Sequence, residues 1–103
     1  MQLSNKEQKL LSTYQNWLKE NKLSSNCNVY FISKTSMLVF QVWDLQKMIS
    51  ETLWLKTNNQ EWKFYIKTLG EKFNKSFSLS EIIEIEKDFV IKTFKEKNAS
   101  NNT

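Results

Sequence analysis

The segment from Ser36 to Lys56, SMLVFQVWDLQKMISETLWLK, constrains the fold most, because it is the only long stretch that is apolar on more than one side. Read as a helix at about 100° per residue, it aligns apolar residues along one face at the spacing expected of a core stripe. That stripe consists of Leu38, Val42, Leu45, Ile49 and Leu53. The sequence therefore predicts that this segment is the central helix of the domain.

The composition also favours helices. The chain of 103 residues has one Gly and no Pro, whereas folds built on tight hairpins usually need more of both. Its hydrophobic content of 40% supplies enough material for a single core. We therefore predict an all-α fold, a small bundle of about four helices around one core. Residues 1–97 are assigned to this single helical domain, and residues 98–103 to a disordered polar tail.

Further helices are predicted on both sides of the central one. Capping-box pairs, Ser4 with Glu7 and Ser78 with Glu81, mark the start of the first and last helices. An apolar stripe within residues 58–73 predicts another helix between the central and last ones.

Two β-hairpins remain as alternatives to this helical interpretation. Val29–Ile32 is a short β-favouring run, and in a hairpin within residues 28–43 it pairs with Met37–Val42. The turn between these runs has neither Gly nor Asn to supply positive φ, which counts against the hairpin. Apolar residues that alternate after Trp62 give a second hairpin, within residues 53–67.

The chain lacks most catalytic and metal-binding equipment. It has no His, the commonest general base and metal ligand, and Cys27 is its single cysteine. One Gly cannot build a Gly-rich phosphate cradle. We therefore expect no enzyme, no cofactor and no metal. Cys27 is interpreted as a small buried apolar residue, and Glu86 as a carboxylate at the rim of the last helix that reaches solvent or a neighbouring Lys.

A membrane location is not expected. The longest uninterrupted apolar run, Met37–Phe40, is far too short to span a bilayer, and the N-terminus is polar. The lone cysteine fits a reducing compartment, so we expect a cytoplasmic protein.

Protein recognition is the predicted function. Opposite the core stripe, aromatic side chains lie among a lysine and a glutamate, and rigid aromatic anchors among polar groups are typical of binding hot spots. The expected partner-binding residues are Phe40, Trp43, Lys47, Glu51, Trp54 and Phe64. The partner is another protein, bound in an accessory, inhibitor or adaptor role, or a second copy of the chain in a homodimer. The composition would suit an accessory protein of a phage or mobile element. Packing inside a single chain explains the same residues equally well.

Binding to the nucleic-acid backbone is the alternative function. All 15 basic residues are Lys, and several of them interleave with aromatic residues in the second half of the chain. Stacking aromatics among lysines suit a single strand, but without Arg we expect no base-specific readout. The candidate lysines are Lys56, Lys63, Lys67, Lys72 and Lys75.

Overall fold

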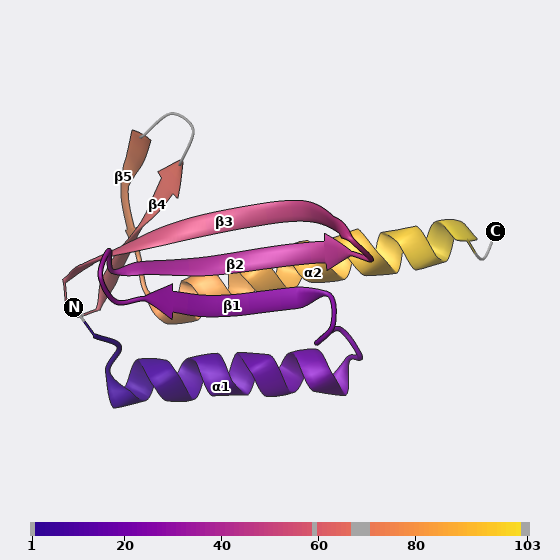
Figure 1. Cartoon of the computed structure of the whole chain (residues 1–103), viewed down its shortest axis with the longest axis horizontal. Coiled ribbons are helices and arrows are strands. Elements are labelled where there is room, and N and C mark those ends of the chain that lie inside the picture. Colours follow the sequence, from indigo (N-terminus) through magenta and orange to yellow (C-terminus); the bar gives the residue numbers. More distant parts are fainter. Residues whose placement is uncertain (1, 59, 67–70, 102–103) are drawn as a thin grey trace.

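The computed structural model describes residues 2–58, 60–66 and 71–101, which form two helices and five strands (Figure 1). In chain order the elements are α1 (Asn5–Glu20), β1 (Cys27–Ile32), β2 (Met37–Asp44), β3 (Lys47–Asn58), β4 (Glu61–Ile66), β5 (Glu71–Phe77) and α2 (Leu79–Asn101). The five strands lie between the two helices in the sequence.

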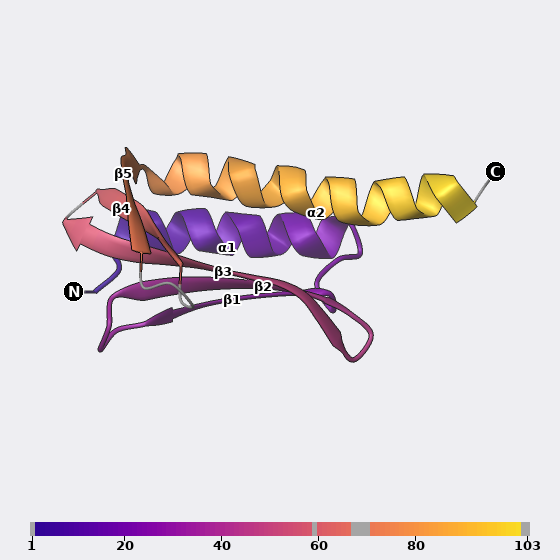
Figure 2. The same cartoon turned by 90° about the horizontal axis from the view of Figure 1, so that it is seen from above.

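The strands form one antiparallel sheet in the order β1-β2-β3-β4-β5, so that each strand pairs with the next along the chain. β1 and β5 are the two edge strands. Both helices lie on the same side of the sheet (Figure 2), and they run in the same direction (Figure 1). We call the side under the helices the covered face and the opposite side the open face.

The predicted all-α bundle is wrong, because the structure combines two helices with a five-stranded antiparallel sheet. The segment 36–56, predicted as the central helix, forms most of the β2–β3 hairpin. Of the stripe within 58–73, predicted as another helix, Trp62 and Ile66 lie on β4 and Phe73 on β5, while 67–70 lie outside the described residues. Both alternative hairpins, within 28–43 and 53–67, are present as β1–β2 and β3–β4.

Side chains alternate between the two faces of a strand, which explains why the apolar stripe within residues 36–56 was wrongly interpreted as a helix. Leu38, Phe40 and Val42 lie on the covered face of β2 and are all buried, while Val39 lies between them on the open face. A strand that is apolar on both faces also shows an apolar stripe when it is plotted as a helix. Leu45, predicted to be in the core stripe, is 93% exposed in the turn between β2 and β3.

The tight turns are made without glycine. Ser36, before β2, has a φ of 56°, and Leu45, between β2 and β3, also has a φ of 56°. A non-glycine residue in this left-handed region costs about 1–2 kcal/mol. The pairing of β2 with its two neighbours offsets this cost, so the absence of glycine did not exclude the hairpins.

The starts of the first and last helices are confirmed. Ser4 accepts the N–H of Glu7 and donates its own N–H to the Glu7 carboxylate, which is the predicted capping box of α1. Ser78 and Glu81 exchange the same two hydrogen bonds at the start of α2. The assignment of residues 1–97 to a single domain and of 98–103 to a disordered tail stays a prediction.

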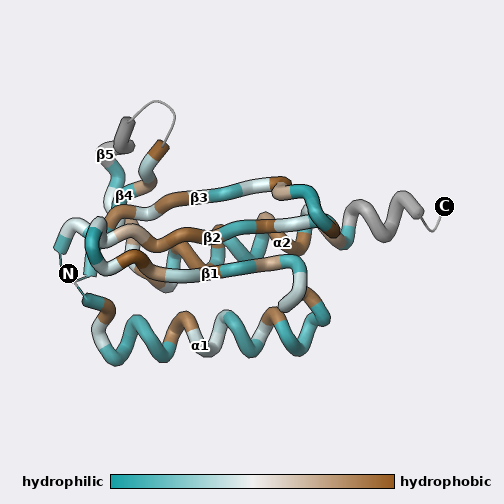
Figure 3. Tube along the Cα trace, in the orientation of Figure 1, coloured by the Kyte–Doolittle hydropathy of each residue, from teal (hydrophilic) through white to brown (hydrophobic). Residues whose placement is uncertain are grey.

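The hydrophobic core lies between the covered face and the two helices. Trp62 of β4 and Ile82 of α2 have no exposed surface, and Tyr14 of α1 is 2% exposed. Colouring by hydropathy shows hydrophobic residues recurring along β1, β2 and β3 (Figure 3). All the helices of the described chain pack on this one face, so no helix lies over the apolar residues of the open face.

Candidate functional site

The open face of the sheet carries a cluster of apolar side chains. The register of the strands places Tyr30, Val39, Leu53 and Tyr65 in one row across β1 to β4. A second row, in the same order, is Ile32, Met37, Leu55 and Lys63. We call the apolar members of these rows the open-face patch: Tyr30, Ile32, Met37, Val39, Leu53, Leu55 and Tyr65.

The open-face patch is more apolar than a water-facing sheet surface normally is. In an antiparallel sheet with one solvated face, that face usually carries polar residues. Here Tyr30 and Ile32 are 44% and 40% exposed, whereas Val39 at the centre is 1% exposed. Met37, Leu53, Leu55 and Tyr65 are half-buried. Apolar side chains gathered on a sheet face that no helix covers make this face a candidate interaction site.

Polar side chains border the patch. The next row along the strands is Asn28, Gln41 and Glu51. Gln41 Nε2 donates to Glu51 Oε2 at 2.8 Å, and Trp43 Nε1 donates to Gln41 Oε1 at 3.3 Å. Lys63 lies at the opposite border, beside Leu55. An apolar centre with a polar rim is the usual anatomy of a protein interface.

Three of the residues predicted to bind a partner lie on the covered face. Phe40 and Trp54 are 2% and 3% exposed, and Phe64 packs against Trp54 with ring centroids 5.0 Å apart. Trp54 also meets Phe77, at a centroid distance of 5.2 Å. These aromatic residues contribute to the core instead of forming a surface.

The other three predicted residues are not brought together into one site. Trp43 and Glu51 both contact Gln41 at the polar border of the open-face patch. Lys47 is exposed next to the turn between β2 and β3. The predicted interface is therefore split between the core, the border of the patch and the hairpin end.

The five lysines of the nucleic-acid alternative do not form one surface either. Lys56 is 6% exposed and is bound by Glu7. The others are dispersed: Lys63 is half-buried on the open face, Lys75 is exposed on β5, Lys72 is described only by its pairing opposite Tyr65, and Lys67 lies outside the described residues.

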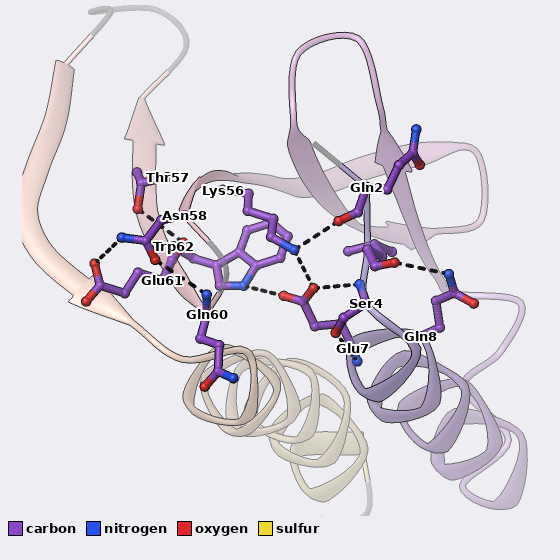
Figure 4. A network of polar contacts seen from close by, with 11 residues as sticks. Gln2, Ser4, Glu7, Gln8, Lys56, Thr57, Asn58, Gln60, Glu61 and Trp62 are labelled. Carbon is purple, nitrogen blue, oxygen red and sulfur yellow. Dashed lines mark hydrogen bonds and ion pairs between the residues drawn. The ribbon is translucent and has the colours of Figure 1, made fainter.

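A buried ion pair joins the start of α1 to the β3–β4 hairpin (Figure 4). Lys56 Nζ lies 2.5 Å from Glu7 Oε1 and donates to the backbone oxygen of Gln2 at 3.0 Å. Trp62 Nε1 donates to the second carboxylate oxygen of Glu7 at 3.2 Å. The Glu7 and Lys56 side chains are only 8% and 4% exposed.

The environment keeps the Glu7 carboxylate ionised. Burial by itself raises the pKa of Glu7, but the hydrogen bonds from Lys56 and Ser4 and the charge of Lys56 outweigh it and hold the pKa below its ordinary value. A pocket of about 380 Å³ opens beside the pair and is lined by the first residues of both helices. Within the described parts of the chain, no buried side-chain polar atom lacks a partner, so Glu7 and Lys56 present a completed network to this pocket.

A second buried acid, Glu86 of α2, corrects the sequence interpretation of a carboxylate at the rim. Its side chain accepts hydrogen bonds from Thr52 Oγ1 at 2.6 Å and from Trp54 Nε1 at 3.4 Å, and the residue is 3% exposed. Burial raises the pKa of Glu86, and the two hydrogen bonds offset only part of this effect. Glu86 thus connects α2 to β3 inside the core.

Cys27 is buried, as predicted. Burial, together with the nearby charge of Glu86, raises the pKa of its thiol to about 11. A thiol with such a pKa is a poor nucleophile near neutral pH. Residues 2–58, 60–66 and 71–101 contain no group of three or more His, Cys, Asp or Glu side chains placed to hold a metal ion.

A groove of about 440 Å³ runs beside the edge strand β1. Its walls are α1, the α1–β1 connection and β1 itself, and its lining residues are Gln15, Leu18, Lys19, Ser24, Cys27, Asn28, Val29 and Tyr30. Tyr30 belongs to both this groove and the open-face patch. The two surfaces are therefore continuous at β1.

Sequence reasoning missed both surfaces because they depend on the sheet. In the sequence of β2 only Gln41 interrupts the apolar run from Met37 to Trp43, so the alternation of a half-exposed strand is too weak to locate the open face. No helix in the described part of the chain is long and apolar enough to cross a membrane. Comparison with known proteins finds no matching family model, no similar curated protein and no similar solved structure.

Proposed function

We propose that this protein acts without catalysis, by binding another protein through the open-face patch. The observation that carries the proposal is that both helices cover one face of the sheet, while the opposite face is apolar at its centre. Removing such a surface from water is the main driving force of most protein association.

The distribution of side chains on the open face fits this role. Tyr30 and Tyr65 stand at the two ends of the central row, and rigid aromatic anchors are enriched in binding hot spots. Val39 and Leu53 fill the space between them. The Gln41 amide and the Glu51 carboxylate supply polar groups at the border, where an interface remains partly wet.

The size of the patch indicates that the partner contacts more than its apolar centre. Four strands about 4.8 Å apart and two rows about 6.8 Å apart give a projected area of roughly 250 Å². A standard interface buries about 800 Å² on each partner. We infer that the contact extends over the polar border and the edge of β1.

Binding to the nucleic-acid backbone has less support. Lys56 is engaged by Glu7 in the interior, and Lys63 borders an apolar surface. The expected result with a polynucleotide is weak binding that vanishes as salt is raised, whereas binding of the protein partner persists.

Site-specific photo-crosslinking tests the proposal. A benzophenone amino acid is placed at Leu55, in the patch, or at Lys9, an exposed position on α1, and each protein is irradiated in an extract of its native host. The proposal predicts a discrete protein adduct from position 55 that position 9 does not give. The adduct should disappear when Leu53→Lys is added, with folding checked by circular dichroism. Equal adducts from both positions, or none from position 55, would contradict the proposal.

The same variants show whether the partner is a second copy. If it is, light scattering on the purified protein gives a dimer that Leu53→Lys converts to a monomer. A monomer at all concentrations, together with a heterologous adduct, identifies a different protein as the partner.

A further inference from the structure

We propose that the free edge of β1 binds an extended segment of the partner protein as a sixth strand of the sheet. This inference rests on the proposed function of protein recognition and specifies the form in which the partner is recognised. Addition of a strand to a sheet edge uses main-chain hydrogen bonds for affinity and side-chain contacts for selectivity.

β1 lacks the lysines, prolines and bulges that block many edge strands. In the described chain it pairs with β2 alone, and that pairing runs without a register shift from Cys27 to Ile32. Its sequence, CNVYFI, contains no Lys and no Pro. Edge strands are usually blocked by lysines, prolines or bulges, because an open edge is a template for another strand.

The backbone of β1 directs hydrogen-bonding groups away from the sheet. Trp43 N donates to Asn26 O at 2.7 Å, which makes these two residues a hydrogen-bonded pair. In an antiparallel ladder such pairs recur at every second residue. The next hydrogen-bonded pairs are then Asn28 with Gln41 and Tyr30 with Val39.

It follows that the backbone N–H and C=O groups of the intervening residues of β1 point away from β2, towards the free edge. The N–H and C=O groups of Cys27, Val29 and Phe31 point to the free edge, while their side chains turn to the covered face. The hydrogen bonds between β2 and β3 agree with this alternation, since Lys56 N donates to Ser36 O at 2.9 Å. Even-numbered residues of β2 thus bond to β3, and odd-numbered residues bond to β1.

α1 lies over the space beside β1, in the helix layer, and a groove leaves that space open in the plane of the sheet. In the face-on view α1 lies beyond the β1 edge, and the view from above shows it in the same layer as α2 (Figures 1 and 2). The groove of about 440 Å³ lies between α1 and β1. A sixth strand about 4.8 Å from β1 would therefore sit in this groove, under the side of α1 that bears Leu18.

The position of α1 selects an extended segment over a second copy of this chain. Antiparallel pairing of β1 with the β1 of another copy needs a two-fold axis perpendicular to the sheet, which places the helices of both copies on the same side. The helices of the second copy would then occupy the layer in which α1 already lies. A single extended segment brings no helix and avoids this collision.

The lining of the groove defines the chemistry of the segment. Side chains on one face of the added strand would contact Gln15 and Lys19 of α1, and those on the other would extend the open-face patch beside Tyr30. Lys19 at the wall favours an acidic residue nearby. The preferred segment is thus a β-favouring run with apolar side chains beside Tyr30 and a carboxylate near Lys19.

The test uses random linear twelve-residue peptides displayed on phage, selected against the full chain. Val29→Pro removes one outward N–H and leaves the hydrogen bonds to β2, because Val29 is not bonded to β2. Val29→Ala is the matched control, because it shortens the same side chain and keeps the N–H. Circular dichroism establishes that both variants are folded.

The proposal predicts enriched peptides whose affinity falls at least 10-fold in Val29→Pro and changes less than about 3-fold in Val29→Ala, because only the former loses a backbone bond. No enrichment, or equal affinity for the two variants, would overturn strand addition. Peptides whose affinity falls in Leu53→Lys and is unchanged in Val29→Pro would overturn strand addition but would still agree with binding through the open-face patch. Failure of photo-crosslinking at position 55, with Val29→Pro-sensitive peptides present, would instead reject the open-face patch.

Discussion

Removing the positive end of the buried ion pair should destabilise the fold strongly. Lys56→Met keeps an unbranched stem without the ammonium group and leaves Glu7, a residue that is 6% exposed, without its cation. Glu7 retains the hydrogen bonds from Ser4 N–H and Trp62 Nε1. Breaking a buried pair by removing one partner usually costs 3–5 kcal/mol, and these remaining bonds place the expected loss near 3 kcal/mol.

Urea unfolding followed by tryptophan fluorescence measures this loss, since Trp62 itself donates to Glu7. For a domain of this size, a loss of about 3 kcal/mol lowers Tm by roughly 12–24 °C. Glu7→Gln and the double variant complete a double-mutant cycle, and we expect a coupling energy above about 1.5 kcal/mol. A free energy of unfolding for Lys56→Met within 1 kcal/mol of the wild type would refute the account of this network.

The same pair predicts a dependence on pH. The pKa of Glu7 is lowered in the folded state, so the unfolded chain takes up its proton first as the pH falls. The ion pair therefore stabilises the fold fully above the unfolded pKa, and this stability is lost as the pH drops through the folded pKa. The difference in the free energy of unfolding between the wild type and Lys56→Met should be constant near pH 7 and should become smaller below about pH 4.5. A difference that grows on acidification would contradict the assignment.

Three further predictions follow from single residues. Because burial raises the pKa of Glu86, the wild type should lose stability relative to Glu86→Gln as the pH rises above 4.5, measured by urea unfolding; parallel pH profiles would contradict this. Cys27, with a pKa of about 11, should be about 0.1% thiolate at pH 8 and react with a disulfide reagent far more slowly than in urea; equal rates would exclude its burial. Leu45→Gly should raise the free energy of unfolding by about 0.5–1 kcal/mol by relieving the φ of 56°, whereas Gln46→Gly should not; equal effects would contradict a local origin.

The helix starts could be predicted from the sequence because their signals are local. The Ser4–Glu7 and Ser78–Glu81 pairs act within a single turn, and both form the expected bonds. The interior of the chain could not be predicted in this way. Apolar residues on both faces of β2 mimic a helical stripe, and only the pairing with its two neighbours decides between the two periods.

The candidate surface was misplaced for the same reason. Phe40 and Trp54 share a side with the core once the segment is extended, so their aromatic rings pack under the helices. Lys56 looked like a solvated lysine, and nothing near it in the chain indicated Glu7, which lies 49 residues away. The groove at β1 depends on where α1 crosses the sheet, and that placement is a tertiary property with no local signal.

Residue-resolved amide exchange on β1 tests recognition at this edge most directly. In the free protein, the amides of Asn28 and Tyr30 should be protected by β2, while those of Val29 and Phe31 exchange at least 100-fold faster. Adding a selected peptide should slow Val29 and Phe31 by more than 10-fold and leave Tyr30 unchanged. Protection of Val29 and Phe31 already in the free protein, or no slowing when the peptide is bound, would contradict an edge that receives a partner strand.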